Sequence, residues 1–318
     1  MENKLFTTIN LVDIVKSDIK YKISRFPDGQ QNINILGWTN DHSAKYLIVL
    51  IKARLNNFLD LELITCTVAS LRELGVEQIH LYTPYIMGAR SDRKFEEGGN
   101  NYLKDVICPI INSLNFKSVT CIDPHSDVLE ACIKGFKKKS NLELVEFALY
   151  ETYQDNWRKE TDNISWGHYR QFDLMKKDNF ILISPDAGAS KKIYKLAGQI
   201  GYKGDVITCS KDRDADGKLT KTVVPVSTIV NKDYIIIDDI CDGGATFINI
   251  AKVLKAQLHE SNRIYLIITH GIFSKGFEEL SKYFDGIYCT NSYSDLLDNF
   301  ETFPDKATFN KTKQLNVF

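Results

Sequence analysis

The chain has 318 residues, of which 43% are hydrophobic and 25% are charged, as in globular proteins with one or two domains. Its formal net charge of -1 excludes partners held by bulk charge, so we expect no nucleic-acid partner and no membrane partner. Acids and amides interrupt every apolar stretch of residues 1–20, which indicates neither a signal peptide nor a membrane span and favours a cytoplasmic protein.

The seven cysteines are odd in number, and none belongs to a CxxC pair. Most lie in apolar runs, where a free thiol behaves as a small hydrophobic side chain. We therefore expect reduced structural thiols rather than disulfides.

Short runs rich in β-branched residues alternate with amphipathic stretches along the chain. The runs lie at 46–51, 78–82, 118–122, 180–184, 206–209, 234–238, 264–269 and 287–289. A helical stripe with one buried face follows the run at 234–238 and is formed by Phe247, Ile250, Ala251, Leu254 and Leu258. Apolar strands that alternate with helices predict an α/β fold with mainly parallel sheets covered on both faces.

This pattern occurs twice, once before and once after a polar, aromatic-rich stretch at 149–177. We interpret that stretch as a domain joint carrying an insertion, which predicts one domain at 1–148 and another at 149–318. In open parallel sheets, ligands bind beyond the carboxyl ends of the strands. The residues that directly follow each strand are therefore the candidates for a functional site.

Two polar segments carry clustered positive charge. PYIMGARSDRK at 84–94 places Arg90, Arg93 and Lys94 close together, and forked guanidinium donors suit polyphosphate oxygens. CSKDRDADGKLTK at 209–221 has no apolar anchor, which predicts a mobile loop. The alternatives are a solvated basic surface for the first segment and a charged hairpin turn for the second.

An acidic, glycine-rich segment follows the strand at 234–238. It contains Asp238, Asp239, Asp242, Gly243, Gly244, Ala245 and Thr246. The glycines let backbone N–H groups approach an anion, the helix that follows adds its positive end, and the threonine adds a hydroxyl. The three acids repel phosphate, so we expect them to bind ribose hydroxyls or a bridging Mg²⁺. The alternative is that the segment only caps the helix.

The segment 234–247 resembles the phosphoribosyl-pyrophosphate-binding signature that phosphoribosyltransferases share with ribose-phosphate pyrophosphokinases, also called phosphoribosyl pyrophosphate synthetases. Four more segments resemble the synthetases specifically: RFPDGQQNINI at 25–35, PYIMGARSDRK at 84–94, CIDPHSD at 121–127 and SPDAGASKK at 184–192. From these segments the chain is identified as a divergent member of that family. The resemblance implies two phosphoribosyltransferase-like domains, the first on the ATP side and the second binding ribose phosphate.

The resemblance also implies a magnesium-dependent transfer of the β,γ-diphosphate of ATP to the 1-hydroxyl of ribose 5-phosphate, carried out by a homo-oligomer. It implies ATP contacts from Phe26, Asp28, Gln30, Arg90, Ser91, Arg93 and His125. Mg²⁺ ligands are implied at His125 and Asp186, with Asp238 or Asp239 as further candidates. Lys211, Arg213 and His125 are implied as catalytic residues, and the segment 238–246 as the ribose-phosphate site.

The chain departs from the family in several places. Gly243 stands where the signature has its first threonine, and Ser91 and Val128 each replace a glutamine. The chain also ends soon after its last expected strand, so we do not expect the C-terminal helix that family members use in subunit contacts and regulation.

These departures raise the alternative of a larger acceptor such as ADP-ribose, with a second adenine stacked on Tyr153, Trp157, Trp166 and Tyr169. Two rival classes remain. A phosphoribosyltransferase has no need of the segments at 84–94, 121–127 and 209–221. A catalytically silent synthetase-associated protein is expected to lack groups such as His125 and Lys211.

Overall fold

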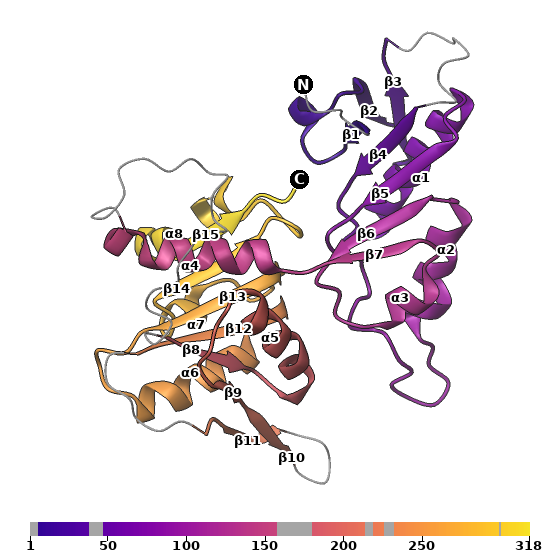
Figure 1. Cartoon of the computed structure of the whole chain (residues 1–318). Coiled ribbons are helices and arrows are strands. Elements are labelled where there is room, and N and C mark those ends of the chain that lie inside the picture. The colour runs from indigo at the N-terminus through magenta and orange to yellow at the C-terminus, as the bar shows by residue number, and fades with distance from the viewer. Residues whose placement is uncertain (1–5, 38–46, 158–179, 214–218, 226–231, 299) are drawn as a thin grey trace. The chain divides into compact units, whose positions relative to one another are not determined.

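The computed structural model describes residues 6–318 except 38–46, 158–179, 214–218, 226–231 and 299 (Figure 1). The chain divides into two compact units, Met1–Ser140 together with Val317–Phe318, and Asn141–Asn316. It therefore passes from one unit to the other twice. The domain boundary expected after residue 148 falls inside helix α4 (Leu142–Trp157).

The first unit is built on a parallel sheet in the strand order β1-β4-β5-β6-β7. Its strands are β1 (Thr7–Asn10), β4 (Ile48–Lys52), β5 (Gln78–Tyr82), β6 (Ser118–Ile122) and β7 (Phe136–Lys139). The helical elements are η1 (Ile14–Lys16), α1 (Phe58–Glu73), η3 (Leu103–Ile107), α2 (Cys108–Ser113) and α3 (Val128–Cys132). A separate antiparallel hairpin is formed by β2 (Tyr21–Arg25) and β3 (Gln31–Ile35).

The second unit is built on a larger parallel sheet in the order β15-β14-β13-β12-β8-β9. Its strands are β8 (Phe180–Ser184), β9 (Val206–Thr208), β12 (Asp233–Cys241), β13 (Ile264–Gly271), β14 (Gly286–Thr290) and β15 (Thr312–Leu315). Besides α4, the helical elements are α5 (Ala187–Gln199), α6 (Ala245–Gln257), α7 (Glu278–Ser281), η5 (Leu296–Asp298), η6 (Phe300–Thr302) and α8 (Lys306–Lys311). A second hairpin is formed by β10 (Ser210–Arg213) and β11 (Leu219–Val223).

The central strand β12 is buried on both faces. Tyr234 and Ile236 pack in one cluster with Phe247 of α6. Ile235 and Ile237 pack in another cluster, which contains residues of α4 and α5. The alternation follows from the two-residue period of a strand, and it confirms the expected α/β class with mainly parallel sheets flanked by helices.

All eight β-branched runs overlap strands of the structure, so these predictions are confirmed. Strand β7 was not expected, because its sequence FKKK carries no apolar alternation. It lies at the edge of its sheet, where lysines prevent pairing with another chain.

The interpretation of residues 149–177 as a joint was wrong for its first residues, 149–157. Residues 149–157 are the second half of α4, whose side chains Leu144, Val145, Ala148 and Leu149 are buried in the core of the second unit. The sequence did not reveal this helix because the residues beyond 149 are mostly polar, so few apolar residues recur at helical spacing there. Residues 158–179 lie outside the part of the chain that the structure describes.

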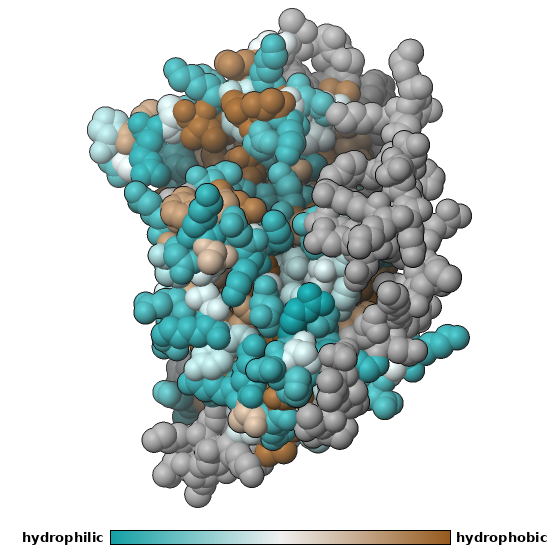
Figure 2. Space-filling view, turned by 90° about the vertical axis from the view of Figure 1, so that its left-hand side faces the viewer, coloured by the Kyte–Doolittle hydropathy of each residue, from teal (hydrophilic) through white to brown (hydrophobic). Residues whose placement is uncertain are grey.

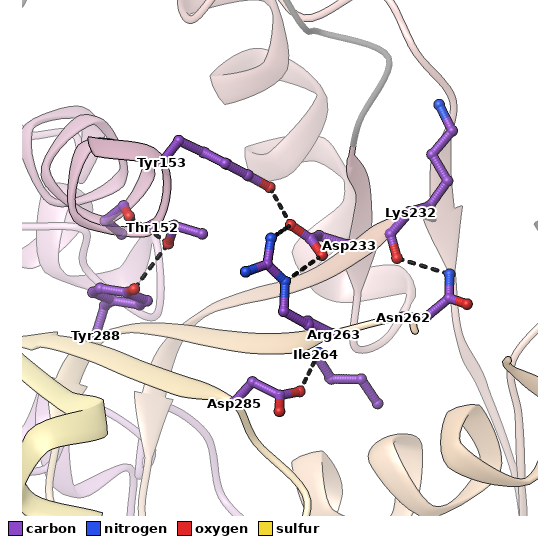
Figure 3. Close-up of polar contacts among 10 residues, drawn as sticks. Thr152, Tyr153, Lys232, Asp233, Asn262, Arg263, Ile264, Asp285 and Tyr288 are labelled. Atoms are coloured by element: carbon purple, nitrogen blue, oxygen red, sulfur yellow. Dashed lines mark hydrogen bonds and ion pairs between the residues drawn. The ribbon is translucent and has the colours of Figure 1, made fainter. Parts of the chain in front are cut away.

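A polar network locks the amino ends of the strands in the second unit (Figure 3). Arg263 donates to both carboxylate oxygens of Asp233, from Nε over 3.0 Å and from Nη2 over 2.9 Å. The Tyr153 hydroxyl donates to the same carboxylate over 2.8 Å. Burial, and then the charge of Asp233, raise the pKa of Tyr153 far above its usual value, so its hydroxyl keeps its proton and remains a donor. The network therefore joins α4 to the starts of β12 and β13.

The seven cysteines are all free thiols, as expected. Burial raises the pKa of Cys108 and of Cys289 to about 12, so both stay protonated and behave as small apolar side chains. The face shown in Figure 2 is largely hydrophilic and is broken by smaller groups of hydrophobic residues. Within the described ranges, no helix is both long enough and apolar enough to cross a membrane.

We predict that Asp233→Ala lowers the free energy of unfolding by about 2 to 3 kcal/mol, because it removes three hydrogen bonds and leaves the Tyr153 hydroxyl without this acceptor. Urea denaturation measures the loss. The control is Asp298→Ala, which removes an exposed carboxylate and is expected to change the free energy by less than about 0.5 kcal/mol. Equal losses in the two variants would contradict the anchoring role of Asp233.

Candidate functional site

The carboxyl end of β12 carries two adjacent acids. Asp238 is half-buried, and Asp239 is only 7% exposed. The backbone N–H of Asp239 donates to Asp238 Oδ1 over 2.9 Å. Both acids therefore lie at the edge of the sheet where ligands of parallel α/β folds bind.

The loop that follows leads directly into α6. Gly244 precedes the helix with a φ of +78°, and a Cβ at this position would lie 3.1 Å from Leu280 Cδ2, so the position favours glycine. Gly244 has no side chain to cap the helix, and no acid lies in the first turn of α6, which the structure describes in full. In that turn, Ala245 is exposed and Thr246 is half-buried. The positive end of α6 is thus suited to an anion.

The loop after β13 packs against this segment and holds it. The Cys241 carbonyl accepts hydrogen bonds from the N–H groups of Ile272, over 2.9 Å, and Phe273, over 3.1 Å. The Ser274 hydroxyl donates to Asp242 Oδ1 over 2.5 Å. Asp242 therefore has a structural contact that the sequence did not reveal, because its partner lies in the loop that follows another strand.

Asp186 follows β8, which pairs with β12 in the same sheet. Its Oδ1 accepts the Ala189 N–H over 3.2 Å and caps α5, and its carbonyl accepts the Ser184 hydroxyl over 2.7 Å. Asp186 is half-buried at the same sheet edge as Asp238. The structure gives it a capping role, and the expected metal role stays a prediction.

Lys192 is a residue of this site that the sequence analysis did not single out. Its Nζ lies 2.7 Å from Oδ2 of Asp239. It belongs to α5 and lies in the segment SPDAGASKK, whose match to the family was the only available signal.

Lys211 and Arg213 lie on strand β10. Lys211 pairs with Thr222 and Arg213 pairs with Leu219 of β11, with a register shift between Asp212 and Arg213. The backbone matches the hairpin alternative for this segment. Residues 214–218 and the side chains of Lys211 and Arg213 lie outside the described part of the structure, so the catalytic roles stay predictions.

In the first unit, two candidate segments follow the neighbouring strands β5 and β6. After β5, Arg90 is exposed, the Ser91 N–H donates to the Gly88 carbonyl over 2.8 Å, and Arg93 lies 5.3 Å from the centre of the Phe95 ring. After β6, the exposed His125 follows Asp123, whose N–H donates to the Lys139 carbonyl over 2.8 Å.

Because β5 and β6 are paired and parallel, these two segments lie at the same edge of the first sheet. The structure therefore brings the expected phosphate-contacting segments of this unit to one place.

The expected adenine contacts lie at the tip of the β2–β3 hairpin. The Gly29 N–H donates to the Phe26 carbonyl over 2.9 Å, and the Phe26 N–H donates to the Gln30 carbonyl over 2.8 Å, which closes a tight turn. Phe26, Asp28 and Gln30 are all exposed, and Phe26 presents 53% of its surface. A large apolar ring held on a turn of this kind is suited to contact another molecule.

The described residues contain no group of three or more His, Cys, Asp or Glu side chains that could hold a metal ion. His125 belongs to the first unit and Asp186 to the second. A single carboxylate such as that of Asp186 is still compatible with Mg²⁺, which keeps several waters and is commonly held by substrate phosphates.

The expected stacking role of Tyr153 was wrong. Its ring stacks on Phe180 with centroids 6.2 Å apart, and its hydroxyl is bonded to Asp233 at the amino end of β12. The ring therefore lies at the opposite end of this strand from Asp238 and Asp239. The side chain of Trp157, and Trp166 and Tyr169, lie outside the described residues.

Comparisons with known proteins complete this picture. No protein-family model matches the chain. A ribose-phosphate pyrophosphokinase of Mycoplasmopsis pulmonis is 27% identical over 249 residues, which cover 77% of this chain and 67% of the relative. The enzyme of that name from Saccharolobus solfataricus is 24% identical over 256 residues, which cover 80% of this chain and 78% of the relative.

The fold is also found in a solved structure. The phosphoribosylpyrophosphate synthetase of Mycobacterium smegmatis matches 96% of this chain and 88% of its own, with a TM-score of 0.69 and 16% identity. This likeness confirms the expected architecture of two phosphoribosyltransferase-like domains. Over most of its length, the chain is similar to curated ribose-phosphate pyrophosphokinases at 24% to 27% identity, in agreement with the resemblance to that family found in its sequence segments.

Proposed function

We propose that the chain is a diphosphotransferase that moves the β,γ-diphosphate of ATP to the 1-hydroxyl of ribose 5-phosphate, giving phosphoribosyl pyrophosphate and AMP. The observation that supports this most is the segment 238–246, which places two acids near the carboxyl end of a buried parallel strand and enters α6 through two glycines. The curated relatives with similarity over most of the chain are named ribose-phosphate pyrophosphokinases, which favours this reaction over others on the same fold.

The second unit would bind the sugar phosphate. The 5-phosphate is suited to the start of α6, where the backbone N–H groups of Gly243–Thr246 and the Thr246 hydroxyl are the expected donors. The carboxylates of Asp238 and Asp239 are suited to the ribose hydroxyls, because carboxylates accept hydrogen bonds and repel phosphate. This division keeps like charges apart within a small site.

The first unit would bind ATP through Phe26, Asp28 and Gln30 at the adenine and through Arg90, Ser91, Arg93 and His125 at the phosphates. The 1-hydroxyl oxygen attacks the β-phosphorus in line, and AMP leaves with the bridging oxygen. The chain's residues align the reactants and neutralise the charge that builds on the transferred group, a role proposed for Lys211 and Arg213. Mg²⁺, bound with ATP and near His125 and Asp186, would neutralise the same charge when present. We propose a homo-oligomer in which the exposed Phe26 meets a neighbouring subunit.

The rival readings are less well supported. A phosphoribosyltransferase has no use for the segments at 84–94 and 121–127, which the first unit brings to one sheet edge. The alternative acceptor ADP-ribose was expected to stack its adenine on four aromatic rings. One of them, Tyr153, is engaged at the other end of β12. The names of the curated relatives also give that acceptor no support.

Incubation of the purified protein with MgATP and ribose 5-phosphate is expected to release AMP and phosphoribosyl pyrophosphate, identified by mass. Arg90→Ala and Lys211→Ala are each expected to lower kcat/KM about 10²-fold to 10³-fold, because each removes a cation from the phosphate site. Lys203→Ala, at an exposed lysine outside the proposed sites, is the control. Exchange of pyrophosphate with a nucleobase in the absence of ATP would contradict the proposal and favour a phosphoribosyltransferase.

The acceptor is tested in a separate assay. We expect AMP release with ribose 5-phosphate to be at least about tenfold more efficient than with ADP-ribose, because a second adenine needs apolar surface that Tyr153 does not supply. The measurement compares kcat/KM for the two acceptors at saturating MgATP. A higher kcat/KM with ADP-ribose would show that ADP-ribose, and not ribose 5-phosphate, is the acceptor. The proposed transfer of a diphosphate from ATP would still hold.

A further inference from the structure

An ion pair links α5 to the acid at the end of β12. Lys192 Nζ lies 2.7 Å from Asp239 Oδ2, and the two residues are 47 positions apart in the sequence. The Asp239 side chain is 8% exposed, whereas the Lys192 side chain is 41% exposed. The lysine thus reaches from the surface to a carboxylate that is almost completely buried.

This arrangement distinguishes the two adjacent acids of the segment. Along β12, Ile235 and Ile237 pack on the side of α4 and α5, and the bond from Lys192 shows that Asp239 faces the same side. Tyr234 and Ile236 pack on the side of α6, so strand alternation places Asp238 on that side, near the start of the helix. The ion pair from α5 therefore acts on Asp239.

A buried carboxylate is unfavourable unless a cation or several donors compensate its charge. Lys192 supplies that charge on one oxygen, Oδ2, and so restricts the rotation of the carboxylate about its side-chain bonds. A restricted acceptor loses less conformational entropy when it binds a hydroxyl, and its direction is set before the ligand arrives.

We propose that Lys192 is a positioning residue that orients the Asp239 carboxylate toward the ribose hydroxyls of the sugar phosphate. Asp238, on the side of α6, binds the sugar from the side of the glycine loop. The inference rests on the proposed function, because it assigns roles within the ribose-phosphate site.

The test compares Lys192→Ala, Lys192→Arg and Lys191→Ala, the last being an exposed neighbour on the same helix. We expect Lys192→Ala to raise the KM for ribose 5-phosphate about 10-fold to 100-fold, because a misplaced acceptor weakens sugar binding. The KM for ATP is expected to change less than about twofold. Lys192→Arg is expected to restore the KM for ribose 5-phosphate to within about fivefold, since a guanidinium also pairs with a carboxylate. Lys191→Ala should match the wild type.

A purely structural ion pair gives a different result. It predicts that Lys192→Ala lowers the Tm while both KM values stay at the wild-type level, which would overturn the proposal. A direct contact between Lys192 and the substrate is tested in the Asp239→Asn background. There, positioning predicts that Lys192→Ala has no further effect on the KM for ribose 5-phosphate, whereas an additive effect would show that the lysine acts independently of Asp239.

Calorimetric titration with ribose 5-phosphate separates this inference from the proposed reaction. If the wild type forms no AMP but binds ribose 5-phosphate, the reaction is wrong, and weaker binding by Lys192→Ala than by Lys191→Ala would still support the positioning role. Equal dissociation constants for these two variants, or no binding by the wild type, would overturn it.

Discussion

The charge at the carboxyl end of β12 is the constraint that organises the second unit. The first five residues of this strand, Asp233–Ile237, are buried, and two acids follow near its carboxyl end, before Ile240 and Cys241. A carboxylate in that position needs compensation, and Lys192 supplies it to Asp239. The loop after β13 meets the same segment through Ser274 and Asp242. Elements that are distant in the sequence are thus held around one strand end.

The two ends of β12 have different tasks. At the amino end, both carboxylate oxygens of Asp233 accept hydrogen bonds from Arg263 and Tyr153. These bonds join a helix to two strands, so the carboxylate serves the fold and not a ligand. At the carboxyl end, the acids are followed by glycines and a helix start suited to an anion. Separation of the two ends along one buried strand lets the stabilising network and the site differ in their electrostatics.

The sequence was informative wherever the signal was local. Runs that are apolar on both faces predicted the central strands, and the contiguous segment 238–246 predicted a site beyond one of them. Prediction from the sequence failed for features that depend on tertiary contacts. The pair Lys192–Asp239 joins residues 47 positions apart, and Tyr153 belongs to a helix whose period is hidden by polar residues. Strand β7 is polar because an edge strand needs no apolar alternation.

Gly243 shows how a departure from the family signature is tied to its surroundings. A Cβ at this position would lie 3.3 Å from Cδ of Lys275 and 3.4 Å from its Cε. The stem of the lysine therefore lies in tight contact with the position where the side chain of the signature threonine would begin, and a Cβ there requires Lys275 to shift by a few tenths of an ångström. Since Lys275 follows Ser274, which is bonded to Asp242, the loop after β13 and the glycine are adapted to each other. Gly243 thus lacks the hydroxyl of the signature threonine, and the side chain of Lys275, a cation, lies beside it on a neighbouring loop. Its charge adds to the positive character of this end of α6.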